Sequence, residues 1–261
     1  MKYVLVGDFH GADLSNLERV LQTLNPDMLI GMSDFDTVKT ILQWMEISKQ
    51  FNTKNVPGNH DVAILKNTPI ISGTLVEQME NDSEQNDIVK YINKLHNKLM
   101  DNKEAREYIN KLVNSAEKIE IFLDEERFGD TYKTIIMHGA LAGDTSSGGP
   151  ESSPNLWARL KREDDYRRNF HAMNLEGYTI MLRAHDHAPI CAYKEPQKSI
   201  IRSGPGTFKL FSDRMYVINP GAFYNGFIAV IDTRATKRGF LLRKSESMPV
   251  LKYARITTLP Q

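Results

Sequence analysis

Histidines and aspartates are concentrated in five short segments of this sequence, four of which follow a run of apolar residues. Such runs are typical of buried β-strands, so the polar segments are predicted to lie at strand ends. The polar residues are Asp8 and His10, Asp34 and Asp36, Asn59 with His60 and Asp61, His138, and His185 with His187. Their carboxylate oxygens and imidazole nitrogens form a mixed ligand set that suits Mn, Fe, Zn, Co or Ni better than Ca or Mg.

The spacing within two of these segments favours chelation. Asp8 and His10 are two residues apart, and in an extended strand such residues point to the same side, so they could hold one cation. His185 and His187 repeat this spacing. With the ligands from the other strand ends there are enough for two ions that share one carboxylate. Two such ions can activate water and hold a phosphoryl group during in-line displacement.

The apolar pattern of the first 60 residues indicates alternating strands and helices. We expect strands at 2–7 and 28–31, helices at 14–24 and 38–51, and a third strand before Asn59. In open α/β sheets, ligands bind beyond the carboxyl ends of the strands. The polar segments are therefore expected to converge in space.

The composition changes at about residue 75, where Glu, Asn and Lys alternate with apolar residues at helical spacing up to residue 118. This pattern predicts two amphipathic helices. We interpret residues 75–118 as a helical insertion that lies beside the site as a partial cap. After it, the pattern predicts a Gly/Ser/Pro-rich loop at 139–154, a helix from about 155, and strands at 119–123, 132–137, 179–182, 216–218, 227–231 and 239–242.

The composition is that of a soluble globular protein, with 261 residues, 33 basic and 33 acidic side chains and 41% hydrophobic residues. These values exclude a disordered or collagen-like chain, and the zero net charge removes one argument for binding nucleic acid. No apolar run approaches the roughly 20 residues of a membrane span, and the apolar start is too short for a signal peptide. We expect a cytoplasmic protein with neither a membrane nor a nucleic-acid partner, and the sequence leaves the oligomeric state open.

Six segments together resemble the calcineurin-like metallophosphoesterase family. They are Gly7–Gly11, Asp27–Asp34, Gly58–Asp61, Met137–Gly139, Ala184–His187 and Asn219–Ala222. They occur in the family order and extend over residues 1 to about 232, nearly the whole chain. The resemblance implies an α/β fold in which two mixed sheets are flanked by helices as a four-layer αββα sandwich. It also implies one domain over residues 1–261, including the insertion.

The same resemblance assigns roles to the polar residues. One metal ion would be held by Asp8, His10, Asp34 and His187, and the other by Asp34, Asn59, His138 and His185, with Asp34 as the bridge. Mn is the first expectation for both ions. His60 would be the general acid, a role that suits imidazole because its pKa is near neutrality. A hydroxide bridging the two metals would be the nucleophile.

The later segments look most like the bacterial and phage protein-phosphatase-like branch. In that branch a Trp-x-Arg segment follows the metal-binding histidine, which makes Arg159 the candidate phosphate clamp. The sequence departs from true protein phosphatases at Thr37–Lys39, where they have Asp-Arg-Gly. Asp36 lies one residue before the position at which the family has the acid that orients the catalytic histidine. Either Asp36 or Asp61 could therefore fill that role.

The predicted function is therefore a metal-dependent phosphoric ester hydrolase that acts on a phosphomonoester, either a small molecule or a phosphoprotein. The alternatives are a phosphodiesterase that acts on cyclic or dinucleoside phosphates and a non-catalytic scaffold, and His60 argues against the scaffold. Outside the site, Cys191 is expected to be a buried inert thiol, Trp157 a core residue, and His96 and His171 solvated surface residues. The Gly148–Pro150 segment is expected to be a flexible loop.

Overall fold

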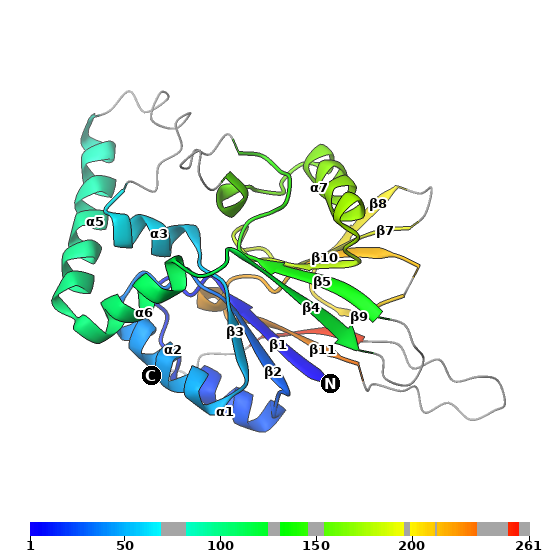
Figure 1. Cartoon of the computed structure of the whole chain (residues 1–261), viewed down its shortest axis with the longest axis horizontal. Coiled ribbons are helices and arrows are strands. Elements are labelled where there is room, and N and C mark those ends of the chain that lie inside the picture. The colour runs from blue at the N-terminus through cyan, green and yellow to red at the C-terminus, as the bar shows by residue number, and fades with distance from the viewer. Residues whose placement is uncertain are drawn as a thin grey trace.

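The computed structural model describes residues 1–68, 82–124, 131–145, 154–195, 199–211, 213–233 and 250–255 (Figure 1). In chain order the elements are β1 (Lys2–Gly7), α1 (Ser15–Leu24), β2 (Met28–Met32), α2 (Val38–Gln50), β3 (Thr53–Asn55), α3 (Asn59–Lys66), α5 (Asp82–Asp101), α6 (Lys103–Val113), β4 (Lys118–Asp124), β5 (Thr131–Met137), η1 (Pro154–Trp157), α7 (Glu163–Glu176), β6 (Ile180–Leu182), β7 (Ile190–Lys194), β8 (Ile200–Ser203), β9 (Thr207–Lys209), β10 (Met215–Asn219), η2 (Phe223–Asn225), β11 (Phe227–Asp232) and β12 (Val250–Arg255), where η marks a 3₁₀ helix. The strand predicted at 239–242, the Gly148–Pro150 loop and residues 75–81 lie outside the described residues.

The described strands form two mixed sheets. The first has the order β3-β2-β1-β11-β12-β9, and its β1, β2 and β3 are parallel while the other pairs are antiparallel. The second has the order β4-β5-β6-β10-β7-β8, with β5, β6 and β10 parallel. In each sheet the parallel strands end at the same edge, and the polar segments begin there.

Alternating side chains divide the core into three apolar layers. Leu5 of β1 and Ile136 of β5 belong to the cluster between the two sheets. Val4 packs on the other face of the first sheet with the helices α1 and α2. Ile135 packs with Phe170 of α7 on the outer face of the second sheet. Helices thus cover both outer faces (Figure 1), and the predicted four-layer αββα sandwich is confirmed.

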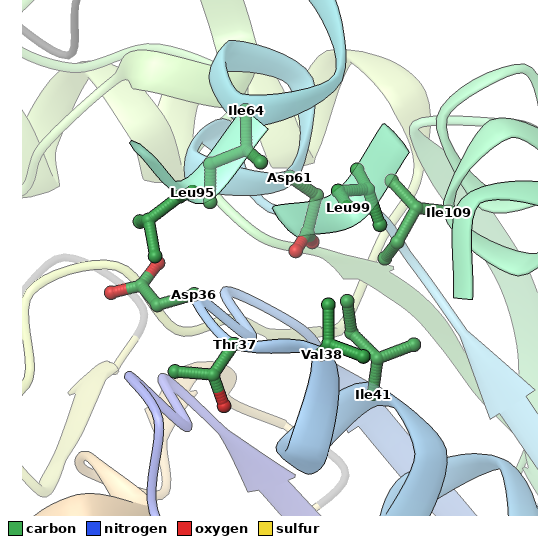
Figure 2. Close-up of a pocket in the computed structure, with 9 residues that line it drawn as sticks. All are labelled: Asp36, Thr37, Val38, Ile41, Asp61, Ile64, Leu95, Leu99 and Ile109. Atoms are coloured by element: carbon green, nitrogen blue, oxygen red, sulfur yellow. The ribbon is translucent and has the colours of Figure 1, made fainter. Parts of the chain in front are cut away.

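The two helices of the predicted insertion pack beside the first sheet. α5 lies against α3, and α6 lies against α2 and α3. Their residues Leu95, Leu99 and Ile109 line a small pocket that also contains Asp36 and Asp61 (Figure 2). The insertion therefore places an apolar wall behind two of the predicted site residues. That the whole chain is one domain with this insertion stays a prediction.

The α-helix predicted from about residue 155 begins later than predicted. After η1 the chain is not helical, and Arg159 forms an isolated β-bridge with Asp144. α7 begins later, at Glu163, because the carboxylate of Asp165 caps it by accepting hydrogen bonds from the amides of Lys161 (3.1 Å) and Arg162 (2.8 Å). Among the described helices, none combines the length and hydropathy of a membrane span.

Candidate metal centre

Three loops that contain predicted ligands leave their strands through left-handed backbone. The φ angles are 52° at Asp8, 41° at His10, 62° at Asp34, 61° at Asp36, 73° at His185 and 59° at His187. This region costs a residue with a Cβ atom roughly 1–2 kcal/mol, and such residues cluster at functional sites. Extended strand geometry therefore does not position these pairs, because the residues lie beyond the strands and the turns direct their side chains. Asp8 and His10 nevertheless belong to one ligand group, as their spacing predicted.

Asp61 holds one of these loops in place. Its buried carboxylate accepts hydrogen bonds from the backbone amides of Asp34 (3.2 Å), Phe35 (3.1 Å) and Gly58 (2.8 Å). Gly58 is required here because a Cβ atom would overlap the carboxylate of Asp34. Asp61 thus joins the loop after β2 to the start of α3, where Asn59 and His60 lie.

Asp8, His10 and His187 form the first ligand group. They offer ligand atoms that all lie within 4.8 Å of one another. The Nε2 atoms of His10 and His187 are 3.0 Å apart, and Nε2 of His187 is 3.9 Å from Oδ1 of Asp8. This set matches three of the four ligands that the family resemblance implies for one ion.

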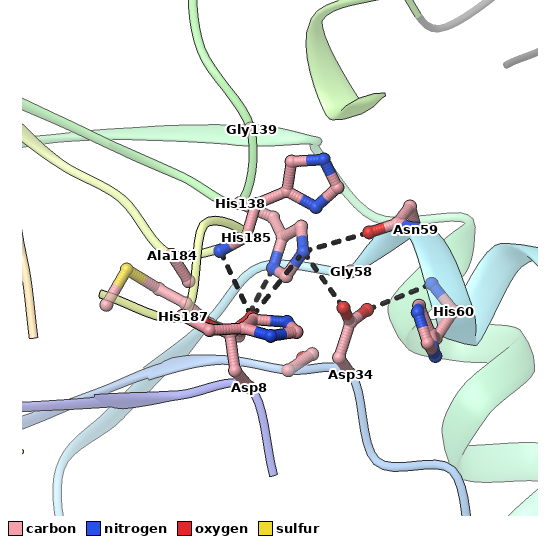
Figure 3. A network of polar contacts seen from close by, with 12 residues as sticks. Asp8, Asp34, Gly58, Asn59, His60, His138, Gly139, Ala184, His185 and His187 are labelled. Carbon is pink, nitrogen blue, oxygen red and sulfur yellow. Dashed lines mark hydrogen bonds and ion pairs between the residues drawn. The ribbon is translucent and has the colours of Figure 1, made fainter. Parts of the chain in front are cut away.

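Asp34, His138 and His185 form the second group by the same distance criterion (Figure 3). Nε2 of His138 is 3.1 Å from Oδ2 of Asp34 and 3.1 Å from Oδ1 of Asn59, which adds the predicted amide ligand. Oδ2 of Asp34 is also 4.0 Å from Nε2 of His10. Asp34 therefore lies between the two groups, as a bridging ligand would.

The pair His185 and His187 is divided between the two groups. From the spacing alone we expected both to chelate one cation, and that interpretation is wrong. The left-handed backbone at both residues turns the two rings to different groups. The division agrees with the assignment that the family resemblance implies.

Each histidine of the two groups has a hydrogen-bond partner for its second ring nitrogen. Nδ1 of His10 contacts Asp36 (2.9 Å), Nδ1 of His138 contacts the Met32 carbonyl (2.9 Å), Nε2 of His185 contacts the Trp157 carbonyl (3.3 Å), and Nδ1 of His187 contacts the Tyr224 hydroxyl (3.2 Å). Partners of this kind fix the tautomer and orientation of metal-ligating histidines. In every ring, one nitrogen is therefore left to face the group.

Two carboxylate oxygens show that the site fits a cation. Oδ2 of Asp8 is buried and has no hydrogen-bond partner among the described residues, and the equally buried Oδ2 of Asp34 faces Nε2 of His138 at 3.1 Å without a well-aligned hydrogen bond. Burial, followed by repulsion from Asp34, raises the pKa of Asp8 to about 6, although His138 opposes the shift. Buried charges are normally paired or bound to metal. Divalent cations would satisfy both oxygens and keep both carboxylates ionised.

The surroundings of two of the histidines favour the neutral ring, the form in which imidazole binds metal. Burial and the neighbouring charge of His10 lower the pKa of His187 to about 4. Burial, with the charges of His138 and Arg159, holds the pKa of His185 well below its usual value. Burial also opposes the charged forms of His10 and His138, but nearby carboxylates raise the pKa of both instead. Carboxylate oxygens and imidazole nitrogens together form a donor set that suits transition metals.

His60 lies beside the first group, and Asp36 orients it. Oδ1 of Asp36 is 2.8 Å from Nδ1 of His60, and Oδ2 is 2.9 Å from Nδ1 of His10. Burial of His60 opposes its charged form, but Asp34 and Asp36 raise its pKa to about 9. Nearby divalent cations would move this value back toward neutrality. Of the two acids considered from the sequence, Asp36 contacts His60, whereas Asp61 bonds to backbone amides.

Arg159 lies at the edge of the second group. Its Nη1 donates a hydrogen bond to the His185 carbonyl (3.2 Å), and 29% of its side chain is exposed. It is close enough to the ligands to meet an anion held there, but its role as a phosphate clamp stays a prediction.

Arg183 was not identified from the sequence. It is completely buried at the end of β6, where it donates hydrogen bonds to the carbonyls of Gly139 (2.8 Å) and Ala158 (3.3 Å) and pairs with Asp186. It thereby joins the loops that contain His138, Arg159 and the His185–His187 pair. A charged residue that directly follows the apolar run 180–182 was the signal that could have identified it.

The other predictions for single residues mostly agree with the structure. Cys191 is buried, which raises its pKa to about 12, and Trp157 lies in an apolar cluster with Val62. His171 is exposed. The prediction for His96 is wrong, because it is half-buried and its Nδ1 lies 2.8 Å from the carbonyl oxygen of Ile64 at the end of α3.

Comparison with known proteins relates this chain to others through its fold. No family model matches the sequence, and no curated protein matches it. The structure is similar to that of a metallophosphoesterase from Sphaerobacter thermophilus, with 17% identity, a TM-score of 0.60 and coverage of 98% of this chain and 88% of that one. It is also similar to a hypothetical protein from Pyrococcus horikoshii OT3, with 12% identity, a TM-score of 0.54 and coverage of 98% and 87%. At these identities the comparison establishes the fold.

Proposed function

We propose that this protein is a calcineurin-like metallophosphoesterase that uses two divalent transition-metal ions, with Mn as the first choice, to hydrolyse a phosphomonoester. The observation that supports this most directly is the arrangement of two ligand groups on either side of Asp34, with His60 and Asp36 next to them. The bacterial and phage branch of the family is the nearest in sequence pattern. The proposed substrates are phosphorylated small molecules or phosphoproteins of the cytoplasm.

In this proposal each ligand group holds one ion. Asp8, His10 and His187 would bind the first, Asn59, His138 and His185 would bind the second, and Asp34 would contact both. When bound, the ions lower the pKa of a water molecule and offset the negative charge of the phosphoryl group. The protein contributes by keeping the ligands in place through the outer hydrogen bonds described above.

His60 is the proposed general acid. Its Nδ1 is held by Asp36, so Nε2 is the nitrogen that can deliver a proton to the leaving oxygen. The ring is 21% exposed, which gives a substrate access to it. After transfer, Nδ1 keeps its proton and its hydrogen bond to Asp36, so the ring stays in place for the next cycle.

Arg159 is the proposed substrate-binding residue. Its hydrogen bond to the His185 carbonyl orients the guanidinium beside the second ligand group. A guanidinium matches phosphate oxygens through two parallel N–H donors. A monoester presents more unesterified oxygens to such a donor pair than a diester does, which favours the monoester over the phosphodiesterase alternative.

The test uses purified protein that is stripped with a chelator and then reloaded with Mn²⁺. Hydrolysis of a chromogenic phosphomonoester and of the matching diester is measured for wild type and His60→Ala. His171→Ala is the matched control, because His171 is an exposed histidine on α7. We expect Mn²⁺-dependent turnover of the monoester, with kcat lowered by about 10²–10⁴ in His60→Ala and unchanged in His171→Ala.

Other outcomes would revise the proposal in specific ways. Faster turnover of the diester would replace the phosphomonoesterase with the phosphodiesterase. Mn²⁺ binding without turnover of either ester would favour the scaffold. Equal kcat for His60→Ala and wild type would remove His60 from the chemistry.

A further inference from the structure

Tyr224 lies at the solvent-facing side of the Asp8–His10–His187 group. Its hydroxyl is 3.2 Å from Nδ1 of His187. Its ring meets those of His10 and His187 at centroid distances of 5.3 and 5.5 Å, with interplanar angles of 79° and 89°. Tyr224 therefore covers two rings of this group while 45% of its own surface is exposed.

The turn after β10 fixes the position of Tyr224. Oδ1 of Asn219 accepts a hydrogen bond from the amide of Gly221 (2.8 Å), and the amide of Ala222 donates to the His187 carbonyl (3.2 Å). Gly221 has a φ of 82°, a conformation that favours glycine, and a Cβ atom there would crowd Pro189. The Asn219–Ala222 segment noted in the sequence thus binds the loop that contains His187.

Phe223 fixes the other side of this turn. It is buried and its ring lies 5.7 Å from that of Phe9, the residue between Asp8 and His10. The residue next to it, Tyr224, is thereby held over the ligand group. The position of Tyr224 is thus set by the same core that positions the ligands.

His187 differs from the other three histidines of the two groups in its outer partner. His10 faces a carboxylate, and His138 and His185 face backbone carbonyls, whereas His187 faces the hydroxyl of a half-exposed side chain. His187 is also the most exposed of these histidines, at 34%. Outer partners of metal-ligating histidines strongly affect metal affinity.

We infer that Tyr224 is a positioning residue that sets the affinity of the ion held by Asp8, His10 and His187. This inference rests on the proposed function, because it requires that the two groups bind ions. Nδ1–H of His187 donates to the Tyr224 hydroxyl, which directs the lone pair of Nε2 toward the group. The ring of Tyr224 also limits the access of water to this side of the site.

The test measures Mn²⁺ binding at equilibrium rather than catalysis. Chelator-stripped protein is titrated with Mn²⁺, and the unbound ion is quantified by its EPR signal. The variants are Tyr224→Phe, which removes only the hydroxyl, and Tyr224→Ala, which removes the ring as well. The matched control is Tyr91→Phe on α5, since Tyr91 is another half-exposed tyrosine, with 49% exposed. Because both tyrosines lie at the surface, the melting temperature of each variant should equal that of wild type.

We expect wild type and Tyr91→Phe to bind two ions. In Tyr224→Phe, one of the two binding steps should weaken by about tenfold or more while the other is unchanged, and Tyr224→Ala should weaken the same step further. Two unchanged binding steps in Tyr224→Phe would overturn this inference and leave the proposed function intact. Absence of Mn²⁺ binding in wild type would overturn both.

Discussion

Replacing Asp36 by Asn should damage two parts of the site at once. The carboxylate accepts hydrogen bonds at both oxygens, from Nδ1 of His60 (2.8 Å) and from Nδ1 of His10 (2.9 Å). An asparagine offers one oxygen and one NH₂ group in nearly the same volume. It can therefore accept from only one of the two rings.

The ring that faces the NH₂ group must accept at Nδ1 and place its proton on Nε2. If that ring is His10, its protonated Nε2 can no longer bind metal, and loss of such an outer partner costs about 10–100-fold in metal affinity. If it is His60, the ring is neutral and no longer paired with a carboxylate, so it is a much weaker acid, and loss of general-acid catalysis lowers kcat by about 10²–10⁴. Asp36→Asn should show both losses in part.

The assay pairs kcat for the chromogenic monoester at saturating Mn²⁺ with an equilibrium Mn²⁺ titration. His60→Ala is the comparison variant and should lose kcat while it keeps its Mn²⁺ affinity. Asp13→Asn is the control, because Asp13 is 55% exposed and pairs with Lys39 at the surface. Asp36→Asn with wild-type kcat and wild-type Mn²⁺ affinity would refute the reasoning.

Three further outcomes follow from the site and the core. Mn²⁺ at about 100 times its Kd should stabilise the fold by about 2.7 kcal/mol per ion. For a chain of this size, each ion should then raise the melting temperature by roughly 5–10 °C. An unchanged melting temperature in differential scanning fluorimetry would contradict metal binding. Burial raises the pKa of Cys191 from 9.0 to about 12, so iodoacetamide should modify it only after unfolding, as mass spectrometry can detect. Since only the unfolded chain releases this proton, its contribution to the free energy of unfolding should decrease as the pH rises from 9.0 toward 12. Urea unfolding should therefore show a steeper decrease for wild type than for Cys191→Ala, in which buried tyrosines such as Tyr216 still contribute. Arg159→Ala should raise KM for the monoester by about tenfold or more because a charged hydrogen bond is lost, whereas Arg167→Ala, at an exposed site on α7, should leave KM unchanged.

Much of the fold could be predicted because its signals are local. The apolar runs at 2–7 and 28–31 and the helical spacing at 38–51 correspond to β1, β2 and α2 within a few residues. Parallel strands bring their carboxyl ends to one edge, so the convergence of the polar segments followed from the strand order. The start of α7 was missed because it depends on capping by Asp165, which competes with helix propensity across residues 155–162.

Residue types and their order along the chain were sufficient to nominate the ligands. Asp8, His10, Asp34, His138 and their partners could be selected because carboxylate and imidazole groups gather at strand ends, where ligands bind in α/β sheets, and because their segments occur in the order of a known family. The choice between Asp36 and Asp61 could not be made in this way. Both are acidic and both follow strands, and only the distances show that Asp36 contacts His60.

The sequence by itself determined the elements of the fold and the chemical groups at the strand ends, since these depend on periodicity and residue type. The tertiary structure decided which way each group points. His185 and His187 turn to different ion positions through left-handed backbone, which non-glycine residues adopt only when distant contacts stabilise it. Such contacts come from Arg183, which joins three loops, and from Tyr224, 37 residues beyond His187 in the chain. Long-range contacts of this kind leave no periodic pattern in the sequence, so only the folded chain reveals them.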